Sequence, residues 1–274
     1  MALFRALETR RRNGLFEDRH AERFLPGALR VVAAGARVPP VREGICLFID
    51  RRWPGARTSA VARTGAIDDL LTDAVREGAR QVVFLGAGYD TRALRMDALA
   101  ETAVYELDQA PLLATKRERI GDTGRARRVE IDFSRDAVLE TLEGAGFDRA
   151  ERAAFVWEGV AHYLTAEAAG ATFRQVAEAA PGSRLIFTYV HSGVIDGSVR
   201  FEADERLRSK VAGVGEPWTF GLDPAELAGY LGERGLRLLS DEGADDYRRR
   251  LLGDAPRNVR GYGFYRLAMA EVAG

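Results

Sequence analysis

Cysteine is almost absent from this sequence of 274 residues, in which Cys46 is the single example. A disulfide within one chain needs two cysteines, and a thiolate zinc site needs a cluster of them, so the sequence excludes both. We therefore expect no metal. The cysteine usage also suits the reducing cytoplasm, and we expect that location.

Long apolar segments and an excess of one charge are missing as well. No window approaches the roughly 20 apolar residues that a membrane-spanning helix needs, and residues 1–20 lack the apolar core of a signal peptide. Lysine and arginine number 40 and aspartate and glutamate 41, which gives a net charge of -1. A general binder of phosphate backbones would carry a basic excess. We thus expect a soluble protein that binds a small molecule, and neither nucleic acid nor membrane.

The first 56 residues differ in character from the rest. They are rich in arginine, contain prolines at positions 26, 39, 40 and 54, and show no clear strand. Since proline ends or breaks helices, this composition predicts short helices separated by turns. We interpret residues 1–56 as a helical cap or lid, followed by a main domain over residues 57–274 that begins with a helix near Ser59–Ala74.

Strands and helices alternate from residue 81 onward. Short apolar segments typical of buried strands occur at Gln81–Leu85, Thr102–Leu107, Arg128–Ile131, Ala153–Trp157 and Arg184–Val190. Apolar strands separated by helical segments predict a parallel sheet with helices on both faces. Two late strands, Leu236–Ser240 and Gly263–Met269, predict an antiparallel pair at one sheet edge. The expected fold class is α/β, a Rossmann-like and mostly parallel seven-stranded sheet.

Glycines follow the first of these strands, in the segment Gly86-Ala87-Gly88. Glycine allows a tight turn and lets a ligand approach the backbone closely. Residues 90–92 begin a helical segment, and we expect free amide groups there to receive a ligand carboxylate. Alone this segment is a weak signal, because a plain turn from strand to helix has the same form.

Acidic residues stand at the ends of the next three strands, at Asp108, Asp132 and Glu158. In a doubly wound sheet the ligand binds outside the carboxyl ends of the strands, so these acids and the glycines point to one crevice. Asp108 is placed to accept the hydroxyls of a ribose, whereas Asp132 could bind an adenine amino group. Either aspartate could instead cap a helix. Glu158 lies in an apolar context and, if buried, needs a cationic ligand or an arginine.

Several stretches of the chain resemble the leucine carboxyl methyltransferase family, which includes bacterial polyketide-type O-methyltransferases. They are Ala62–Thr64, Ile67–Asp69, Val83–Arg92, Tyr105–Asp108, Trp157–Gly159, Tyr163–Leu164 and Trp218–Leu222. The similarity covers most of residues 57–270. It implies a class I methyltransferase fold, with S-adenosylmethionine as the methyl donor and S-adenosylhomocysteine as the product.

The resemblance also assigns residues to the donor site, namely Arg63, Gly86, Ala87, Gly88, Asp108, Asp132, Phe133 and Glu158. By this assignment Arg63 binds the methionine carboxylate, and Glu158 lies near the methionine amino group. Asp108 holds the ribose, while Asp132 and Phe133 flank the adenine. The family usually has leucine where Phe133 stands, and either side chain can pack on adenine.

The acceptor side is less specific. A carboxylate acceptor is ionised at neutral pH and needs no general base, whereas a base would help if the acceptor were a phenol or an alcohol. His162 and His191 follow core strands and are candidate bases, although each could be a packing histidine. Tyr163 is expected to form a wall of the pocket. His162 and Tyr163 are therefore the candidate residues on the acceptor side.

These observations favour an S-adenosylmethionine-dependent O-methyltransferase that acts on a small molecule, either a carboxylate or a polyketide-type hydroxyl. A nicotinamide-dependent oxidoreductase is the alternative enzyme, but Thr91 stands where a dinucleotide-binding motif has its third glycine. A protein that binds the donor without catalysis is the second alternative.

Overall fold

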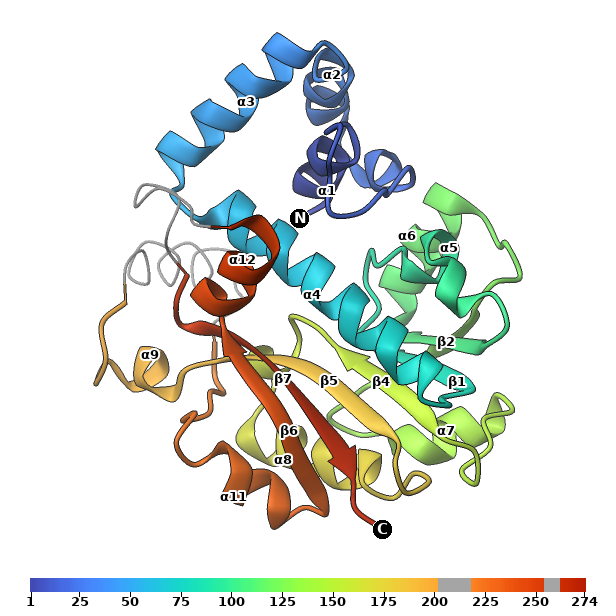
Figure 1. Cartoon of the computed structure of the whole chain (residues 1–274). Helices are drawn as coiled ribbons and strands as arrows, with labels where there is room; N and C mark the ends of the chain where they lie inside the picture. Colours follow the sequence, from blue (N-terminus) through green and yellow to red (C-terminus); the bar gives the residue numbers. More distant parts are fainter. Residues whose placement is uncertain (202–217, 254–261) are drawn as a thin grey trace.

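A single mixed sheet forms the centre of the molecule (Figure 1). The computed structural model describes residues 1–201, 218–253 and 262–274, and within these ranges seven strands follow the order β3-β2-β1-β4-β5-β7-β6. The strands are β1 (Gln81–Leu85), β2 (Ala103–Asp108), β3 (Arg127–Glu130), β4 (Ala153–Trp157), β5 (Arg184–Val190), β6 (Leu236–Gly243) and β7 (Tyr265–Val272). The order reverses between β1 and β4, which is where a doubly wound sheet binds its ligand.

The direction of the strands matches the sequence-based expectation. The strands from β1 to β5 are mutually parallel, with Leu85 of β1 opposite Leu107 of β2 and Phe84 of β1 opposite Val156 of β4. β7 is antiparallel to β5 on one side and to β6 on the other. The predicted α/β class, the mostly parallel seven-stranded sheet and the late antiparallel pair at one edge are confirmed.

Helices cover both faces of this sheet (Figure 1). Outside the N-terminal segment they are α4 (Ala56–Arg76), α5 (Arg92–Arg95), η2 (Asp97–Leu99), α6 (Ala110–Ile120), α7 (Val138–Gly144), η3 (Ala161–Tyr163), α8 (Ala166–Val176), α9 (Ser192–Asp196), α11 (Leu227–Gly232) and α12 (Ala244–Leu252). Alternate residues of β1 enter two cores: Val83 and Leu85 pack with α7, α8 and α11, whereas Val82 and Phe84 pack with α4 and α12. None of the helices that the structure describes has the length and apolar character needed to cross a membrane.

Some helix boundaries differ from the predicted ones. Residues 91–99 contain two short helices, α5 and η2, and the helix predicted over residues 223–234 is confined to α11. α7 begins at Val138, three residues later than predicted. The reason is a turn, in which the Asp132 amide donates to the Asp136 carboxylate at 2.7 Å. Local side-chain bonds of this kind compete with helix formation.

The N-terminal segment consists of short helices, as its prolines predicted. These cap helices are α1 (Ala2–Thr9), η1 (Ala21–Phe24), α2 (Gly27–Gly35) and α3 (Pro39–Arg52). The prolines of α3 lie in its first turn, where proline loses no helical hydrogen bond. Leu7, Ala36 and Ile49 are buried together in a small core of their own. Figure 1 shows the cap helices grouped above α4, at one end of the molecule. Residues 1–56 are thus placed to cover a site there, and their division as a separate domain stays a prediction.

Candidate functional site

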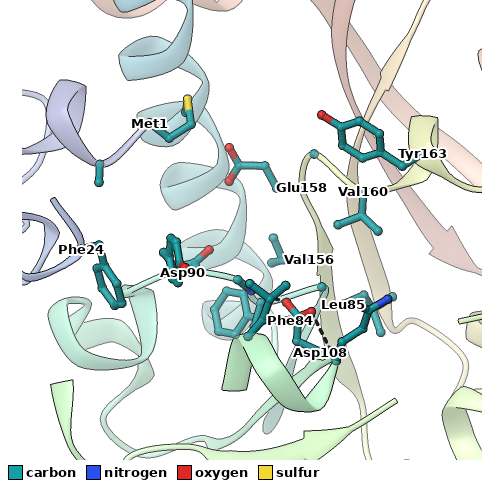
Figure 2. Close-up of a pocket in the computed structure, with 18 of the residues that line it drawn as sticks. Met1, Phe24, Phe84, Leu85, Asp90, Asp108, Val156, Glu158, Val160 and Tyr163 are labelled. Carbon is teal, nitrogen blue, oxygen red and sulfur yellow. Dashed lines mark hydrogen bonds between the residues drawn. The ribbon is translucent and has the colours of Figure 1, made fainter. Parts of the chain in front are cut away.

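A cavity of about 940 Å³ lies between the cap helices and the carboxyl ends of β1, β2 and β4 (Figure 2). Its lining joins cap residues such as Leu3 and Phe24 to the strand ends at Gly86, Asp108 and Glu158. Small-molecule sites typically measure about 300–1,000 Å³, and this cavity is near the upper end of that range. It opens at the reversal of strand order, where the topology predicts a ligand crevice.

Most of the predicted site residues line this cavity. They are Arg63, Gly86, Ala87, Gly88, Asp108, Phe133, Glu158 and Tyr163. Asp132 and His162 are not part of the lining. Segments that follow β1, β2, β3 and β4 therefore do converge on one crevice, although β3 contributes the phenylalanine rather than the aspartate before it.

The glycine loop, residues 86–91, joins β1 to α5 at this crevice. Gly86 and Gly88 have positive φ angles of 72° and 40°, a region that glycine enters without steric cost. A Cβ atom on Gly86 would in addition collide with the side chain of Val160, which itself lines the cavity. The sequence here needs glycine for the backbone angle and for the space beside Val160.

The amides of the glycine loop are bonded to β2. Gly86 and Ala87 both donate to the Leu107 carbonyl oxygen at 2.9 Å. The Gly88 amide donates to Asp108 Oδ2 at 2.5 Å. These bonds fix the first half of the loop against the second strand.

Two of the amides at the start of α5 are bonded within the protein, where free amides were expected. The Asp90 amide donates to the Ala87 carbonyl at 2.7 Å, and the Arg92 amide donates to Asp90 Oδ1 at 2.7 Å. The protein's own carboxylate thus occupies the place in which an external anion was expected. A different group must bind the carboxylate of a ligand in this cavity.

Glu158 has the cationic partners that its burial demands. Its Oε1 accepts from Arg63 Nε at 2.9 Å, and its Oε2 accepts from Arg92 Nη1 at 2.9 Å. Burial alone would raise the Glu158 pKa, but Arg92 and then Arg63 outweigh it, and the pKa is lowered. Glu158 therefore stays ionised at neutral pH and keeps a negative charge at the end of β4.

Asp90 is a second ionised carboxylate in the lining. Burial raises its pKa, but Arg92 and next Lys116 lower the pKa to about 2. Arg92 is itself almost completely buried and also donates from Nε to Asp68 at 2.6 Å. Arg92 thus links α4, the glycine loop and the end of β4.

Arg63 has hydrogen-bonding groups to spare. Its Nε is used by Glu158, and its Nη2 lies 3.8 Å from the sulfur of Met1, which is a weak acceptor. Its Nη1 has no oxygen partner among the described residues. The guanidinium also lies over the Tyr265 ring, 5.0 Å from the centroid. A partly buried guanidinium held in this way can take a ligand carboxylate through its Nη groups.

Asp108 and Phe133 occupy the next part of the lining. The Asp108 carboxylate accepts the amides of Gly88 and Gln109. A carboxylate has about four acceptor positions, so it can also accept ligand hydroxyls. Phe133 presents a half-buried ring to the cavity. The Asp132 side chain is 49% exposed and accepts the Ser134 amide at 2.9 Å, in a turn that precedes α7 and is not its N-cap, which is Ala137.

His162 is buried behind the cavity wall. It is 1% exposed, and its Nε2 forms a hydrogen bond with the Tyr265 hydroxyl at 3.0 Å. Burial, assisted by Arg63, lowers the His162 pKa to about 3. The ring is neutral at physiological pH, and Tyr163 lies beside it with 4.3 Å between ring centroids. This placement favours the packing interpretation over a direct contact with the acceptor.

Tyr163 and His191, the other two candidates on the acceptor side, differ in whether they line the cavity. Tyr163 is 40% exposed and lines the cavity, as expected of a pocket wall. His191 does not line it and caps α9 by accepting the Gly193 amide at 3.0 Å. Within the part of the chain that the structure describes, the cavity lining contains no histidine.

Sequence reasoning missed the buried charges that support the site. Asp68 and Arg92 lie within stretches similar to the family, but the pairing of Arg92 with Asp68 and with Glu158 was not predicted. The partners are 24 and 66 positions apart along the chain. The available signal was the expectation that Glu158, if buried, needs a cationic partner. That expectation did not indicate which arginine would be the partner.

Comparison with known proteins gives a consistent result. The model of the leucine carboxyl methyltransferase family matches residues 1–177, a range that includes the cap helices. A candidate S-adenosyl-L-methionine-dependent methyltransferase of Mycobacterium sp. (strain JLS) is 34% identical over 263 residues, which cover 86% of this chain and 82% of that protein. Another from Frankia alni is 37% identical over 213 residues, or 74% and 70% of the two chains.

Two solved structures share the fold. A DUF574-family protein from Streptomyces avermitilis has a TM-score of 0.60 and 20% identity, covering 85% of this chain and 90% of that one. A candidate methyltransferase from Thermobifida fusca also has a TM-score of 0.60, with 16% identity and coverages of 99% and 94%. The likeness at these identities concerns the arrangement of the elements, which is that of the class I methyltransferases.

Proposed function

This chain belongs to the leucine carboxyl methyltransferase family and is an S-adenosylmethionine-dependent methyltransferase, and on that basis we propose that it methylates an oxygen atom of a small molecule. A carboxylate is the favoured acceptor. The observation that carries this proposal is a cavity whose lining, among the residues that the structure describes, contains ionised carboxylates and arginines but no histidine.

The proposed donor site uses the charges of the lining. When bound, S-adenosylmethionine supplies an electrophilic methyl group on a positively charged sulfur. Arg63 has Nη groups available for its carboxylate, and Glu158 is the anion beside Arg63 for its ammonium group. Asp108 has acceptor positions for the ribose hydroxyls, and Phe133 an aromatic face for the adenine. We assign Asp132 to the turn before α7, since its carboxylate bonds to that turn.

A nicotinamide dinucleotide does not fit the same loop. Binding of a pyrophosphate at such a loop depends on free amides at the start of the following helix. Here Gly86 and Ala87 donate to Leu107, while Asp90 places its own carboxylate on the amide of Arg92. A diphosphate would meet occupied donors and a negative charge, so the oxidoreductase alternative has no structural support.

The pKa values of the carboxylates around the cavity support a carboxylate acceptor. The pKa of Asp90 is about 2 and that of Glu158 is lowered, so that both are too weakly basic to deprotonate an alcohol or a phenol at neutral pH. His162 is buried and neutral outside the lining. A carboxylate is already ionised at neutral pH and becomes a methyl ester without releasing a proton. Its methylation therefore requires no base.

The chemical stability of the product tests this proposal. The protein would be incubated with methyl-labelled S-adenosylmethionine and matched pairs of aromatic acceptors, 1-naphthoate with 1-naphthol and benzoate with phenol, and with a small-molecule extract of its host. Methyl esters release the label as methanol in mild base, whereas ethers keep it. We expect base-labile product from carboxylates or from the extract. Label that survives base in every product would refute the carboxylate assignment.

A further inference from the structure

The cap and the glycine loop are joined at one buried carboxylate. Asp18 lies between α1 and η1, and its side chain is completely buried. Its Oδ1 accepts the amides of His20 and Ala21 at 3.1 and 3.0 Å, which fixes the turn that enters η1. Its Oδ2 accepts the hydroxyl of Thr91 at 2.7 Å, on the glycine loop. One carboxylate thus fixes a turn of the cap and the last residue of the loop.

Arg5 makes a second connection at the same place. Its Nε lies 3.0 Å from Asp18 Oδ2, and its Nη2 donates to the carbonyl oxygen of Tyr89 at 2.7 Å. The ring of Tyr89 stacks on Phe24 of the cap, with 4.7 Å between centroids. The cap therefore contacts the glycine loop through a backbone carbonyl, a side-chain hydroxyl and an aromatic ring.

The two halves of the glycine loop are held by different partners. Gly86, Ala87 and Gly88 are bonded to β2, whereas Tyr89 and Thr91 are bonded to the cap. The sheet thus fixes the first half of the loop and the cap fixes the second half. Thr91 replaces the third glycine of a dinucleotide motif, and its hydroxyl makes this connection possible.

We propose that Asp18 is a positioning residue of the methyltransferase, which holds the second half of the glycine loop in the geometry that binds the donor. It touches neither donor nor acceptor and acts through Thr91, together with Arg5. The inference rests on the proposed donor site at this loop. It gives the cap a part in donor binding, in addition to covering the acceptor.

Calorimetric titration of the full chain with S-adenosylhomocysteine tests the inference. We expect Asp18→Asn and Thr91→Val each to weaken binding about ten-fold. Because both substitutions remove the same interaction, the double variant should bind about as well as the single variant with the lower affinity. Thr91→Ser keeps the hydroxyl and should bind within about two-fold of the wild type, the scatter of neutral substitutions. Glu22→Gln removes an ion pair with Arg10 inside the cap and is the matched control, also expected within about two-fold.

The outcomes separate this inference from the site assignment. Additive effects in the double variant, a Thr91→Ser variant as weak as Thr91→Val, or unchanged binding in both single variants would overturn the role of Asp18. Asp108→Asn is titrated in parallel. If it binds weakly while the Asp18 and Thr91 variants bind normally, only this inference is wrong. If Asp108→Asn also binds normally, the donor site itself has been misplaced. Thermal unfolding of each variant verifies that it is folded.

Discussion

Arg63 of α4 and Glu158 at the end of β4 form a largely buried ion pair, with 2.9 Å between Nε and Oε1. The pair joins the helix that follows the cap to the strand beside the glycine loop. Because Arg63 uses only its Nε on Glu158, the rest of its guanidinium stays available to a ligand in the cavity.

Replacing Arg63 by lysine should separate these two uses. Lysine keeps the charge but lacks the planar fork, so it cannot bind Glu158 and a ligand carboxylate in the same geometry. We expect Arg63→Lys to weaken S-adenosylhomocysteine binding by about 2 kcal/mol, roughly 30-fold. Arg76→Lys, on an exposed position of the same helix, is the control. Equal affinities for the two variants in a calorimetric titration would contradict the assigned role of Arg63.

Asp90 predicts a loss of stability in acid. Its pKa is lowered to about 2 in the folded protein, so its stabilising effect is complete above the unfolded pKa of roughly 3.9 and is lost as the pH falls from there towards 2. We expect the free energy of unfolding to fall with decreasing pH in this window, and Asp90→Asn to reduce the fall by about 2 kcal/mol at most. Urea unfolding at pH 5, 4 and 3 measures the free energy of unfolding of the wild type and of Asp90→Asn.

Asp73→Asn is the control for that series, since Asp73 is an exposed residue of α4. A wild-type protein that loses no more stability in acid than Asp90→Asn would show that the buried arginine does not stabilise the ionised form of Asp90.

Gly86 should tolerate no side chain. Its φ of 72° disfavours any other residue, and a Cβ atom would strike Val160. We expect Gly86→Ala to lower the free energy of unfolding by about 2 kcal/mol or more and to weaken donor binding as Val160 is displaced. Gly44→Ala is the opposite case: it lies inside α3 with open space around it, and should add about 0.5–1 kcal/mol. Denaturant titration compares the two, and similar effects would contradict the account.

His162 should not change its charge near neutrality. Burial and Arg63 lower its pKa to about 3, so its imidazole stays neutral throughout the stable range. We expect the ring carbon signals of His162 in NMR spectra to stay constant between pH 6 and 8, a range close to the usual histidine pKa of about 6.5. His162→Gln identifies the signals by their loss. A His162 signal that titrates near pH 6.5 would restore this residue as a candidate base.

The sequence predicted features that depend on local pattern. The apolar segments identified the five parallel strands. Gly86, Asp108 and Glu158 were found because residues at the carboxyl ends of parallel strands meet at one edge. Topology alone brings these three residues together, so no contact between distant segments had to be known.

The local sequence pattern could not predict the direction of individual side chains or the contacts between distant segments. Asp132 and Phe133 are neighbours in the chain, yet only the phenylalanine lines the cavity. The difference depends on a turn whose hydrogen bonds were not foreseen. The bond between Asp18 and Thr91 spans 73 positions and exists only because the cap packs against the glycine loop. The residues around Asp18 and around Thr91 contain no local signal for such a contact.

Calorimetric titration of S-adenosylhomocysteine into the wild type, Asp108→Asn and the surface control Asp73→Asn tests the central claim, that the donor binds in this cavity with its ribose on Asp108. Loss of hydrogen bonds to a charged group should weaken Asp108→Asn by about 2 kcal/mol, roughly 30-fold, while Asp73→Asn matches the wild type. Binding of Asp108→Asn as tight as that of the wild type, or no binding heat for the wild-type protein, would contradict it.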